Sequence, residues 1–417
     1  MKTLDVSVNG RARAEISELT LETMHRSHVI EIAPATKRNG HSFAIVTDVP
    51  DPDPLNIVIL GLSIMSSWGN GHATTYRGLM RELTARGHTV LFLERETEFA
   101  ANRDLPKPPY GRTALYSTFR ELKERFAKEI RKADLVIVGS YVQEGAAIGD
   151  WVTRQAAGVT AFYDIDTPAT LADLEQGDLD YLSRDLIPRY DMYLSFTGGP
   201  MLRRIEQLYG SRMARPLYGS VDTSLYYPED RDKKWDLGYM GTYSEDRQPA
   251  LDELLLQPAC SWSRGRFVVA GPQYPKSITW PKNVKRYTHL SPDKHRAFYS
   301  AQKFTLNLTR AEMAEAGYSP SVRLFEAAAC GTAIISDFWE GLDKFFVPNQ
   351  EILITDSSEE SLYYLLETTE LQRRQLGERA RARVLSKHTA KHRALELEDY
   401  ARELLRRPAL STVANGL

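Results

Sequence analysis

The segment from Gly317 to Thr332 holds the residue types that a phosphate-bearing ligand requires. A turn-forming Gly-Tyr-Ser-Pro-Ser sequence precedes a run with helical spacing, so a helix should begin close to Ser319 and Ser321. The free backbone N–H groups and the positive dipole end of a helix start favour a bound phosphate. Arg323 and Glu326 are three positions apart and therefore share one helix face. A cation for phosphate beside a carboxylate for sugar hydroxyls predicts a nucleotide-sugar site.

A glycine-rich loop, residues 66–72, follows the apolar run at 57–62. Glycines let a ligand approach the backbone closely, which makes Gly71 a candidate contact for the donor sugar or the acceptor. His72 at the following helix start is a candidate base or hydrogen-bond donor. The alternative is a simple glycine-rich turn with His72 near a helix cap. The glycine spacing is not that of the dinucleotide-binding fingerprint.

Two carboxylates follow another predicted strand, residues 159–163. Asp164 and Asp166 are candidates for a catalytic carboxylate or for binding acceptor hydroxyls. The alternative is that Asp166 or Thr167 caps a helix that begins at Pro168. Because the sequence places no third ligand near these carboxylates, we predict no metal site.

Small and basic residues follow the strand predicted at 236–240. Gly241 and Thr242 allow close approach of a diphosphate, and Arg247 can bind it through two parallel hydrogen bonds. The alternative for Arg247 is an ion pair with a neighbouring acidic residue. Asn307 and the polar residues after it close another apolar strand, which is typical of the rim of a binding site.

These segments require an α/β fold to bring them together. Continuous apolar runs that alternate with helical segments predict buried parallel strands. The alternation restarts near residue 236, after a stretch rich in proline and charge. We therefore predict an α/β protein with two Rossmann-like parallel-sheet domains facing a central cleft. The predicted boundaries are 1–50 for an N-terminal extension with short strands, 51–220 for the first domain, 221–385 for the second, and 386–417 for a C-terminal helix and tail.

The composition is ordinary for a globular protein, with 417 residues, 42% hydrophobic and 26% charged. The formal net charge of -2 argues against a large basic face for nucleic acid. The two cysteines, Cys260 and Cys330, make neither a disulfide framework nor a zinc site, which favours a reducing cytosol. Since no stretch has the apolar length of a signal peptide or a membrane helix, we expect a cytoplasmic protein with no integral membrane association.

The second domain, from Leu237 to about Ile354, resembles the glycosyltransferase-like domain of CgeB-type spore maturation proteins. That family belongs among the GT-B glycosyltransferases. The matching stretches are 239–243 with Arg247, 306–309, 319–331 and 340–342. The stretch 163–168 of the first domain resembles the same family more loosely, and residues 1–50 match no family pattern.

The resemblance implies a GT-B fold and transfer of a sugar from a nucleotide-diphosphate sugar, a UDP-sugar, with no metal or other cofactor. By analogy with retaining enzymes, Glu326 should hold the ribose hydroxyls, and Arg323 and Arg247 should face the diphosphate. Those enzymes often carry a second glutamate eight positions before the first. Tyr318 occupies that position here, which makes it a candidate contact for the donor sugar or acceptor.

Several functions remain compatible with these residues. In an inverting enzyme Asp166 or His72 would deprotonate the acceptor, whereas in a retaining enzyme the leaving phosphate would do so. The acceptor can be a glycan, a protein, a small molecule or a modified base of phage-type DNA. A different class is a non-catalytic structural protein that binds a sugar or nucleotide on a GT-B scaffold.

Overall fold

The computed structural model describes residues 53–68, 72–96 and 100–406. The predicted N-terminal extension, residues 1–50, and the candidate Gly71 lie outside the described residues.

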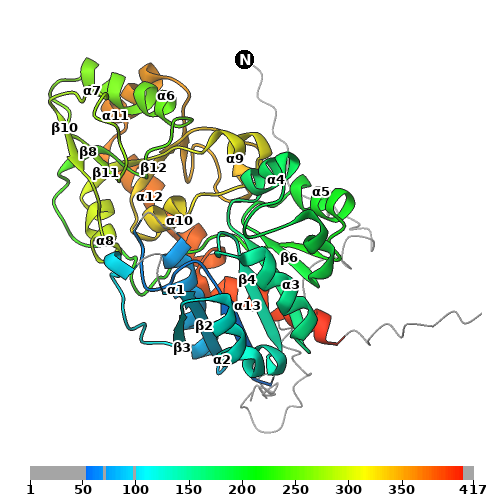
Figure 1. The fold of residues 1–417 in the computed structure, drawn as a ribbon. Helices are drawn as coiled ribbons and strands as arrows, with labels where there is room; N and C mark the ends of the chain where they lie inside the picture. Colours follow the sequence, from blue (N-terminus) through cyan, green and yellow to red (C-terminus); the bar gives the residue numbers. More distant parts are fainter. Residues whose placement is uncertain (1–52, 69–71, 97–99, 407–417) are drawn as a thin grey trace, which may run out of the picture. The chain divides into compact units, whose positions relative to one another are not determined.

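The first sheet has seven parallel strands in the order β3-β2-β1-β4-β5-β6-β7 (Figure 1). These strands are β1 (Asn56–Leu60), β2 (Thr89–Arg95), β3 (Arg112–Tyr116), β4 (Leu135–Gly139), β5 (Val159–Asp164), β6 (Met192–Ser195) and β7 (Ala214–Pro216). The helices of this domain are α1 (His72–Ala85), α2 (Phe119–Lys132), α3 (Gly145–Gln155), α4 (Thr167–Gln176) and α5 (Pro200–Tyr209), with short 3-10 turns η2 (Ala100–Asn102) and η3 (Arg184–Arg189). Ile57 and Ile59 of β1 join one buried cluster, and Val58 and Leu60 join another. Because side chains alternate across a strand, hydrophobic layers cover both faces of this sheet.

The second sheet has six parallel strands in the order β10-β9-β8-β11-β12-β13. These strands are β8 (Trp235–Met240), β9 (Phe267–Ala270), β10 (Val284–Tyr287), β11 (Gln302–Asn307), β12 (Ala333–Ser336) and β13 (Leu353–Ile354). The helices after β7 are α6 (Gln248–Leu251), α7 (Gln257–Ser261), α8 (Pro292–Ser300), α9 (Ala311–Ala316), α10 (Val322–Ala329), α11 (Ser358–Glu367), α12 (Glu370–Lys387) and α13 (Ala390–Leu405), with a π-turn η4 (Asp252–Leu256) and a 3-10 turn η5 (Leu342–Lys344). Two further buried clusters lie on this sheet, so each domain has its own core.

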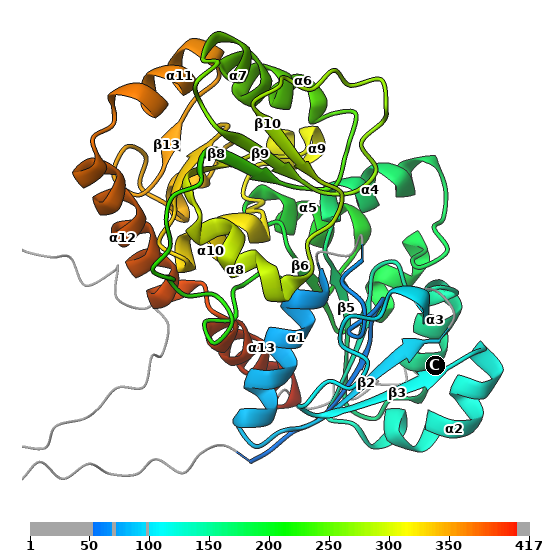
Figure 2. The same ribbon diagram turned by 90° about the vertical axis from the view of Figure 1, so that its left-hand side faces the viewer.

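The chain crosses between the two sheet domains at two points that lie side by side. The N–H of Val221 donates to the carbonyl of His388 at 3.2 Å, and the N–H of Ala390 donates to the carbonyl of Val221 at 2.9 Å. After the second crossing α13 packs against α1 (Figure 2). Ala394 and Leu397 of α13 complete a hydrophobic cluster of the first domain. The C-terminal helix α13 therefore packs on the first domain, although it follows the second domain in the sequence.

The strand order reverses at equivalent places in the two sheets, between β1 and β4 in the first and between β8 and β11 in the second. Ligands of such sheets bind outside the carboxyl ends of the strands near this reversal. Loops that follow β1, β5 and β6 share one cavity with loops that follow β8, β9, β10 and β11. The prediction of two Rossmann-like domains facing a cleft is confirmed.

Three strands that the sequence pattern did not predict all lie at sheet edges: β3, β7 and β10. An edge strand has only one neighbour and is partly solvated, so its sequence need not be a continuous apolar run. In β10 the second residue is exposed and the fourth is Tyr287, which is also exposed. Pro216 ends β7, where a residue without an N–H donor is tolerated.

Candidate active site

The cavity between the two domains has a volume of about 360 Å³. Nine of the predicted site residues line it: His72, Asp166, Gly241, Thr242, Arg247, Ser319, Ser321, Arg323 and Glu326. Three others do not line it: Asp164, Asn307 and Tyr318. The cavity therefore gathers candidates that lie as much as 254 positions apart in the chain, from 72 to 326.

Helix α10 brings Arg323 and Glu326 to the cavity. Ser321 is the N-cap residue, and its hydroxyl accepts a hydrogen bond from the N–H of Arg323 at 3.3 Å. The helix ends where Gly331 takes a φ of +69° and donates its N–H to the carbonyl of Ala328 at 2.9 Å. The predicted helix start at the cavity is thus present, with the cation and the carboxylate on one face.

The guanidinium of Arg323 is held by neutral oxygens. It donates to the carbonyl of Met240 and, at 2.9 Å, to the side-chain oxygen of Asn307, and its centre lies 4.9 Å from the ring of Tyr239. The buried Asn307 therefore contacts the cavity through Arg323. A Cβ at Gly241 would lie 3.0 Å from a terminal nitrogen of Arg323, so the missing side chain leaves room for the guanidinium.

Within the described residues, Arg247 forms no ion pair with a neighbouring acidic residue, which was the alternative to a role in binding. Its terminal nitrogen donates to the carbonyl of Thr242 at 2.7 Å, and its buried Nε has no hydrogen-bond partner. The nearby Asp246 instead accepts the N–H of Ala311 at 2.8 Å. Within the described residues, neither Arg247 nor Arg323 forms a direct ion pair, and both line the cavity.

Residues that the sequence reasoning did not identify surround Glu326. Its Oε2 accepts the hydroxyl of Tyr299 at 3.1 Å, and Nδ1 of His295 lies 3.8 Å away. The hydroxyl of Tyr226 lies 3.0 Å from the same Nδ1. The spacing of His295 and Tyr299, four positions apart on α8, is the one sequence signal that pointed to this group.

His72 lies at the start of α1, beside Phe196, with 5.9 Å between the ring centroids. Burial lowers the pKa of His72 below its ordinary value of 6.5, and the negative charge of Asp166 opposes this effect. The imidazole is therefore neutral at pH 7 and can accept a proton or a hydrogen bond.

Asp166 occupies the N-cap position of α4, but its side chain makes no capping hydrogen bond. Its Oδ2 accepts the hydroxyl of Tyr141 at 3.0 Å and lies 3.8 Å from a guanidinium nitrogen of Arg310 in the second domain. Asp166 is therefore the N-cap residue of α4 by position, while its side chain contacts Tyr141 and Arg310 instead of the helix.

Asp164 is buried behind the cavity. Its carboxylate accepts hydroxyl groups from Tyr193 and, at 3.0 Å, from Thr170. Burial raises its pKa from 3.8 to about 6, although these hydrogen bonds act in the opposite direction.

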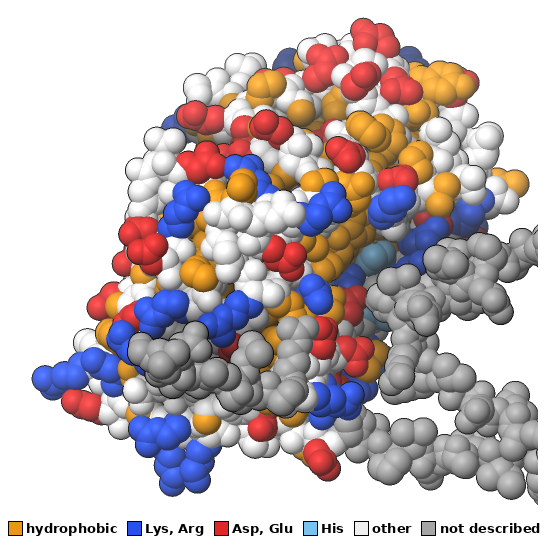
Figure 3. Space-filling view, turned by 90° about the vertical axis from the view of Figure 1, so that its right-hand side faces the viewer, with side chains coloured by type: hydrophobic (Ala, Val, Ile, Leu, Met, Phe, Trp, Pro, Cys, Tyr) orange, Lys and Arg blue, Asp and Glu red, His pale blue; other side chains and the backbone are white. Residues whose placement is uncertain are grey.

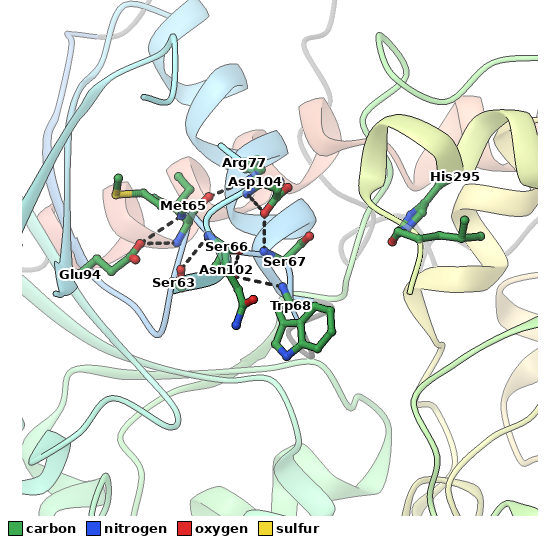
Figure 4. A network of polar contacts seen from close by, with 12 residues as sticks. Ser63, Met65, Ser66, Ser67, Trp68, Arg77, Glu94, Asn102, Asp104 and His295 are labelled. Atoms are coloured by element: carbon green, nitrogen blue, oxygen red, sulfur yellow. Dashed lines mark hydrogen bonds and ion pairs between the residues drawn. The ribbon is translucent and has the colours of Figure 1, made fainter. Parts of the chain in front are cut away.

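The loop between β1 and α1 is fixed from several sides (Figure 4). Glu94 accepts two of its backbone N–H groups, at 2.7 and 3.1 Å. Asp104 accepts another at 2.7 Å and forms a 2.8 Å ion pair with Arg77 of α1. At the end of the loop the ring of Trp68 contacts that of His289, with 4.7 Å between the centroids. This contact joins the first domain to the second at the edge of the cavity.

Tyr318 lies between two glycines, outside the cavity lining. Its ring fills the space where a Cβ would be at Gly199 in the first domain and at Gly341 in the second. Its own φ is +48°, in the left-handed region that few residues other than glycine adopt. The tyrosine therefore packs the junction between the domains.

The surface charges, the possible metal ligands and the helices give three further findings. On the face shown in Figure 3, acidic side chains lie among the basic ones. Within the part of the chain that the structure describes, no group of three or more potential metal ligands occurs, and none of the helices combines the length and apolar character needed to cross a membrane.

Comparisons with known proteins agree with this architecture. Residues 247–399 match a family model described as glycosyl transferase-like. No curated protein matches the chain in sequence. Similar solved structures include sucrose-phosphate synthase (tll1590) from Thermosynechococcus elongatus, at 16% identity and a TM-score of 0.63, covering 84% of this chain and 98% of that one.

Two other similar structures contain ligands. Anabaena Alr3699/HepE in complex with UDP and glucose has 12% identity and a TM-score of 0.64, and 84% of this chain covers 100% of it. An alpha-glucosyltransferase in complex with UDP-glucose and DNA containing an abasic site has 12% identity and a TM-score of 0.65, with the same coverage of 84% and 100%. The chain therefore has the GT-B fold of glycosyltransferases, and its residues 247–399 are similar to a family described as glycosyl transferase-like.

Proposed function

We propose that this protein is a CgeB-type glycosyltransferase that moves a sugar from a UDP-sugar to an acceptor hydroxyl. The observation that carries this proposal is the pair of arginines, Arg247 and Arg323, which line the cavity beside the start of α10 and form no ion pair within the described chain. Glu326, one turn further along the same helix, supplies a carboxylate for ribose hydroxyls. Solved relatives of the fold that contain UDP or UDP-glucose support the choice of nucleotide.

The reaction breaks the bond between the anomeric carbon and a phosphate oxygen and forms a bond from that carbon to the acceptor oxygen. Negative charge develops on the departing UDP. Arg247, Arg323 and the N-terminus of α10 stabilise this charge, a role that makes a metal ion unnecessary in our proposal. Residues of both domains line the cavity, and closing of the domains around a bound donor would exclude water from the reacting atoms.

We favour retention of configuration, by analogy with retaining enzymes of this fold. The leaving phosphate oxygen then takes the acceptor proton, and His72 and Asp166 orient the acceptor hydroxyl. In an inverting reaction one of these two residues would take the proton instead. The anomeric configuration of the product, read by NMR, distinguishes the two courses.

The donor assignment is tested by thermal-shift and calorimetric titration with UDP-, GDP- and ADP-sugars. We expect a UDP-sugar to raise the unfolding temperature, because it binds only the folded protein. Arg323→Ala and Glu326→Ala should lose this binding and keep the wild-type circular dichroism spectrum. Wild-type affinity in both variants would contradict the assignment of the site.

A second candidate, nucleotide-sugar binding without transfer, is favoured by one observation. Tyr318 occupies the position of a donor-sugar glutamate in related enzymes, and it packs between glycines outside the cavity. Release of UDP distinguishes the candidates, measured with glycan, protein, small-molecule and modified-DNA acceptors. Binding without UDP release in every mixture would favour this second function.

A further inference from the structure

A line of hydrogen bonds runs from Asp337 to the guanidinium of Arg323, at the carboxyl ends of β11 and β12. The hydroxyl of Ser336 donates to Oδ1 of Asp337 at 3.2 Å. The oxygen of this hydroxyl accepts the side-chain N–H of Asn307 at 2.9 Å, and the side-chain oxygen of Asn307 accepts from Arg323 at 2.9 Å. Asn307 and Ser336 are register partners in the pairing of the two strands, and both are fully buried.

The carboxylate gives this line of hydrogen bonds one direction. As a carboxylate, Asp337 can only accept, so the hydroxyl proton of Ser336 points to it. The oxygen of Ser336 then accepts the amide N–H of Asn307, whose amide nitrogen also lies 3.5 Å from Oδ1 of Asp337. The opposite end of that amide is its oxygen, and it faces Arg323, which can only donate. Asp337 therefore determines which atom Asn307 presents to the guanidinium.

Asp337 also anchors the loop that follows β11. Its Oδ2 accepts the backbone N–H of Thr309 at 2.7 Å, and its Oδ1 accepts the hydroxyl of Thr309 at 3.0 Å. Leu308, Thr309 and Arg310 of this loop line the cavity, whereas Asp337 does not. Burial raises the pKa of Asp337 above its ordinary value of 3.8, and its hydrogen bonds and then the charge of Arg323 oppose this effect. The carboxylate therefore acts on the cavity through other residues.

We propose that Asp337 is a positioning residue, which holds Arg323 in place for the diphosphate of the donor by fixing the orientation of the Asn307 amide. This inference rests on the proposed function, in which Arg323 stabilises the departing UDP. Because Ser336 and Asn307 are buried, water does not replace a partner that turns away. A reversed amide would direct its N–H groups at the guanidinium, and two donors do not hydrogen bond to each other.

Asp337→Asn reverses this line of hydrogen bonds with little change in shape. The oxygen of the new amide still accepts the N–H of Thr309, so the loop keeps its anchor. The new NH2 group takes the place of Oδ1 and donates to Ser336, whose hydroxyl proton then turns to Asn307. The amide of Asn307 reverses to accept this proton, and Arg323 loses an acceptor.

The affinity for UDP, measured by calorimetry, should therefore fall by about tenfold in Asp337→Asn. Loss of the negative charge alone would act in the opposite direction, because a carboxylate near a phosphate site weakens the binding of an anion. The sign of the change thus separates positioning from charge. Uridine lacks the phosphates that Arg323 would contact, so its affinity, measured by ligand-observed NMR, should stay at the wild-type value.

A double-mutant cycle tests whether Asp337 acts through Asn307. In an Asn307→Ala background no amide remains to reverse, so Asp337→Asn should no longer lower the affinity for UDP. A merely structural role of Asp337 predicts the same loss in both backgrounds and weaker binding of uridine as well.

The matched control is Asp236→Asn. Asp236 is a buried carboxylate that accepts the backbone N–H of Arg266 at 2.9 Å, at the start of β8 and therefore at the opposite end of the same parallel sheet. This variant should bind UDP as the wild type does. Ser336→Ala removes the bridging hydroxyl without a change in charge, and it should lower the affinity for UDP by about threefold. Unchanged affinity in Ser336→Ala would contradict transmission through this hydroxyl.

The outcomes separate this inference from the proposed function. If the wild type binds UDP and Asp337→Asn binds it equally well or more tightly, the role of Asp337 is overturned and the proposed function stands. Equal losses of affinity for UDP and uridine, or a loss that persists in the Asn307→Ala background, overturn it as well. If the wild type binds no UDP, the proposed function fails, and this inference fails with it. Thermal unfolding of each variant shows whether a loss of affinity reflects a loss of folding.

Discussion

Asp166 of the first domain faces Arg310 of the second across the cavity, with 3.8 Å between a carboxylate oxygen and a guanidinium nitrogen. The same oxygen accepts the hydroxyl of Tyr141, a residue with a φ of +65° at the carboxyl end of β4. A left-handed conformation at a residue other than glycine costs free energy, and such strain is often found at functional sites. These two contacts direct the carboxylate of Asp166 into the cavity, away from the backbone N–H groups at the start of α4.

Replacement of Asp166 tests this arrangement through the pH dependence of transfer. Asp166→Asn should lower kcat by about a hundredfold, as expected for loss of a carboxylate that positions or deprotonates the acceptor. The charge of Asp166 opposes the lowering of the pKa of His72 by burial, so its removal should lower that pKa further. The acid limb of the profile of kcat/KM against pH should then move to lower pH.

Tyr141→Phe is the matched control for this prediction, because it removes a hydrogen bond to Asp166 and keeps the charge. The acid limb should stay in place, and kcat should fall by about tenfold or less. A shift of the limb in Tyr141→Phe as large as that in Asp166→Asn would show that the charge of Asp166 is not its cause.

Arg323 tests whether the cavity needs a guanidinium or only a positive charge. Arg323→Lys keeps the charge but cannot reach the carbonyl of Met240, the side chain of Asn307 and a phosphate together. We expect the affinity for UDP to fall by about a hundredfold in calorimetry. Arg374→Lys on the exposed side of α12 is the control and should bind as the wild type does. Full affinity in Arg323→Lys would reduce the role of this residue to its charge.

The sequence predicts those parts of the site that depend on local pattern. The start of α10, with Arg323 and Glu326 on one face, follows from a cap residue and a three-residue spacing. The contact of Tyr226 with His295 cannot be predicted in this way, because the residues are 69 positions apart and meet only when the second domain folds. Likewise, the spacing of Asp164 and Asp166 does not reveal which carboxylate faces the cavity.

The strands also divide into those that the local sequence predicts and those that depend on distant contacts. Strands buried on both faces are apolar throughout, so the central strands of both sheets are evident in the sequence. The edge strands β3, β7 and β10 are partly polar and acquire their structure from pairing with one neighbour. Local composition therefore predicts the central strands and one edge strand, β13, and does not predict the other three edge strands.

The buried carboxyl of Asp164 predicts a pH dependence of stability. Burial raises its pKa from 3.8 to about 6, so between these values the folded protein keeps a proton that the unfolded chain releases. The free energy of unfolding should therefore fall by about 3 kcal/mol as the pH rises through this window, and should then level off. Urea unfolding of Asp164→Asn should lack this contribution.

The matched control is Asp173→Asn on the exposed side of α4. The comparison is made as the difference in unfolding free energy between each variant and the wild type, at about pH 4 and about pH 7. Asp164→Asn should gain stability relative to the wild type at the higher pH. An equal difference at both pH values would mean that Asp164 titrates alike in the folded and unfolded chains.

The packing of Tyr318 between glycines predicts a specific coupling with Gly341. Gly341 has a φ of +85°, and an added Cβ would lie 2.5 Å from the ring of Tyr318. Gly87 has a nearly equal φ of +89° and no atom within 4 Å of such a Cβ. Gly87→Ala should therefore lower the free energy of unfolding by about 1 kcal/mol, through backbone strain alone. Gly341→Ala should lower it by about 3 kcal/mol, because the ring of Tyr318 must also move.

A double-mutant cycle measured by urea unfolding tests this coupling. In the Tyr318→Ala background, Gly341→Ala should cost no more than Gly87→Ala does, because the ring that meets the new methyl group is gone. An unchanged cost in that background would contradict packing of the ring against Gly341. Tyr318→Phe keeps the ring and removes the hydroxyl, so it should leave both the stability and the KM for the donor at their wild-type values. A raised KM in Tyr318→Phe would instead show that the hydroxyl reaches the donor sugar.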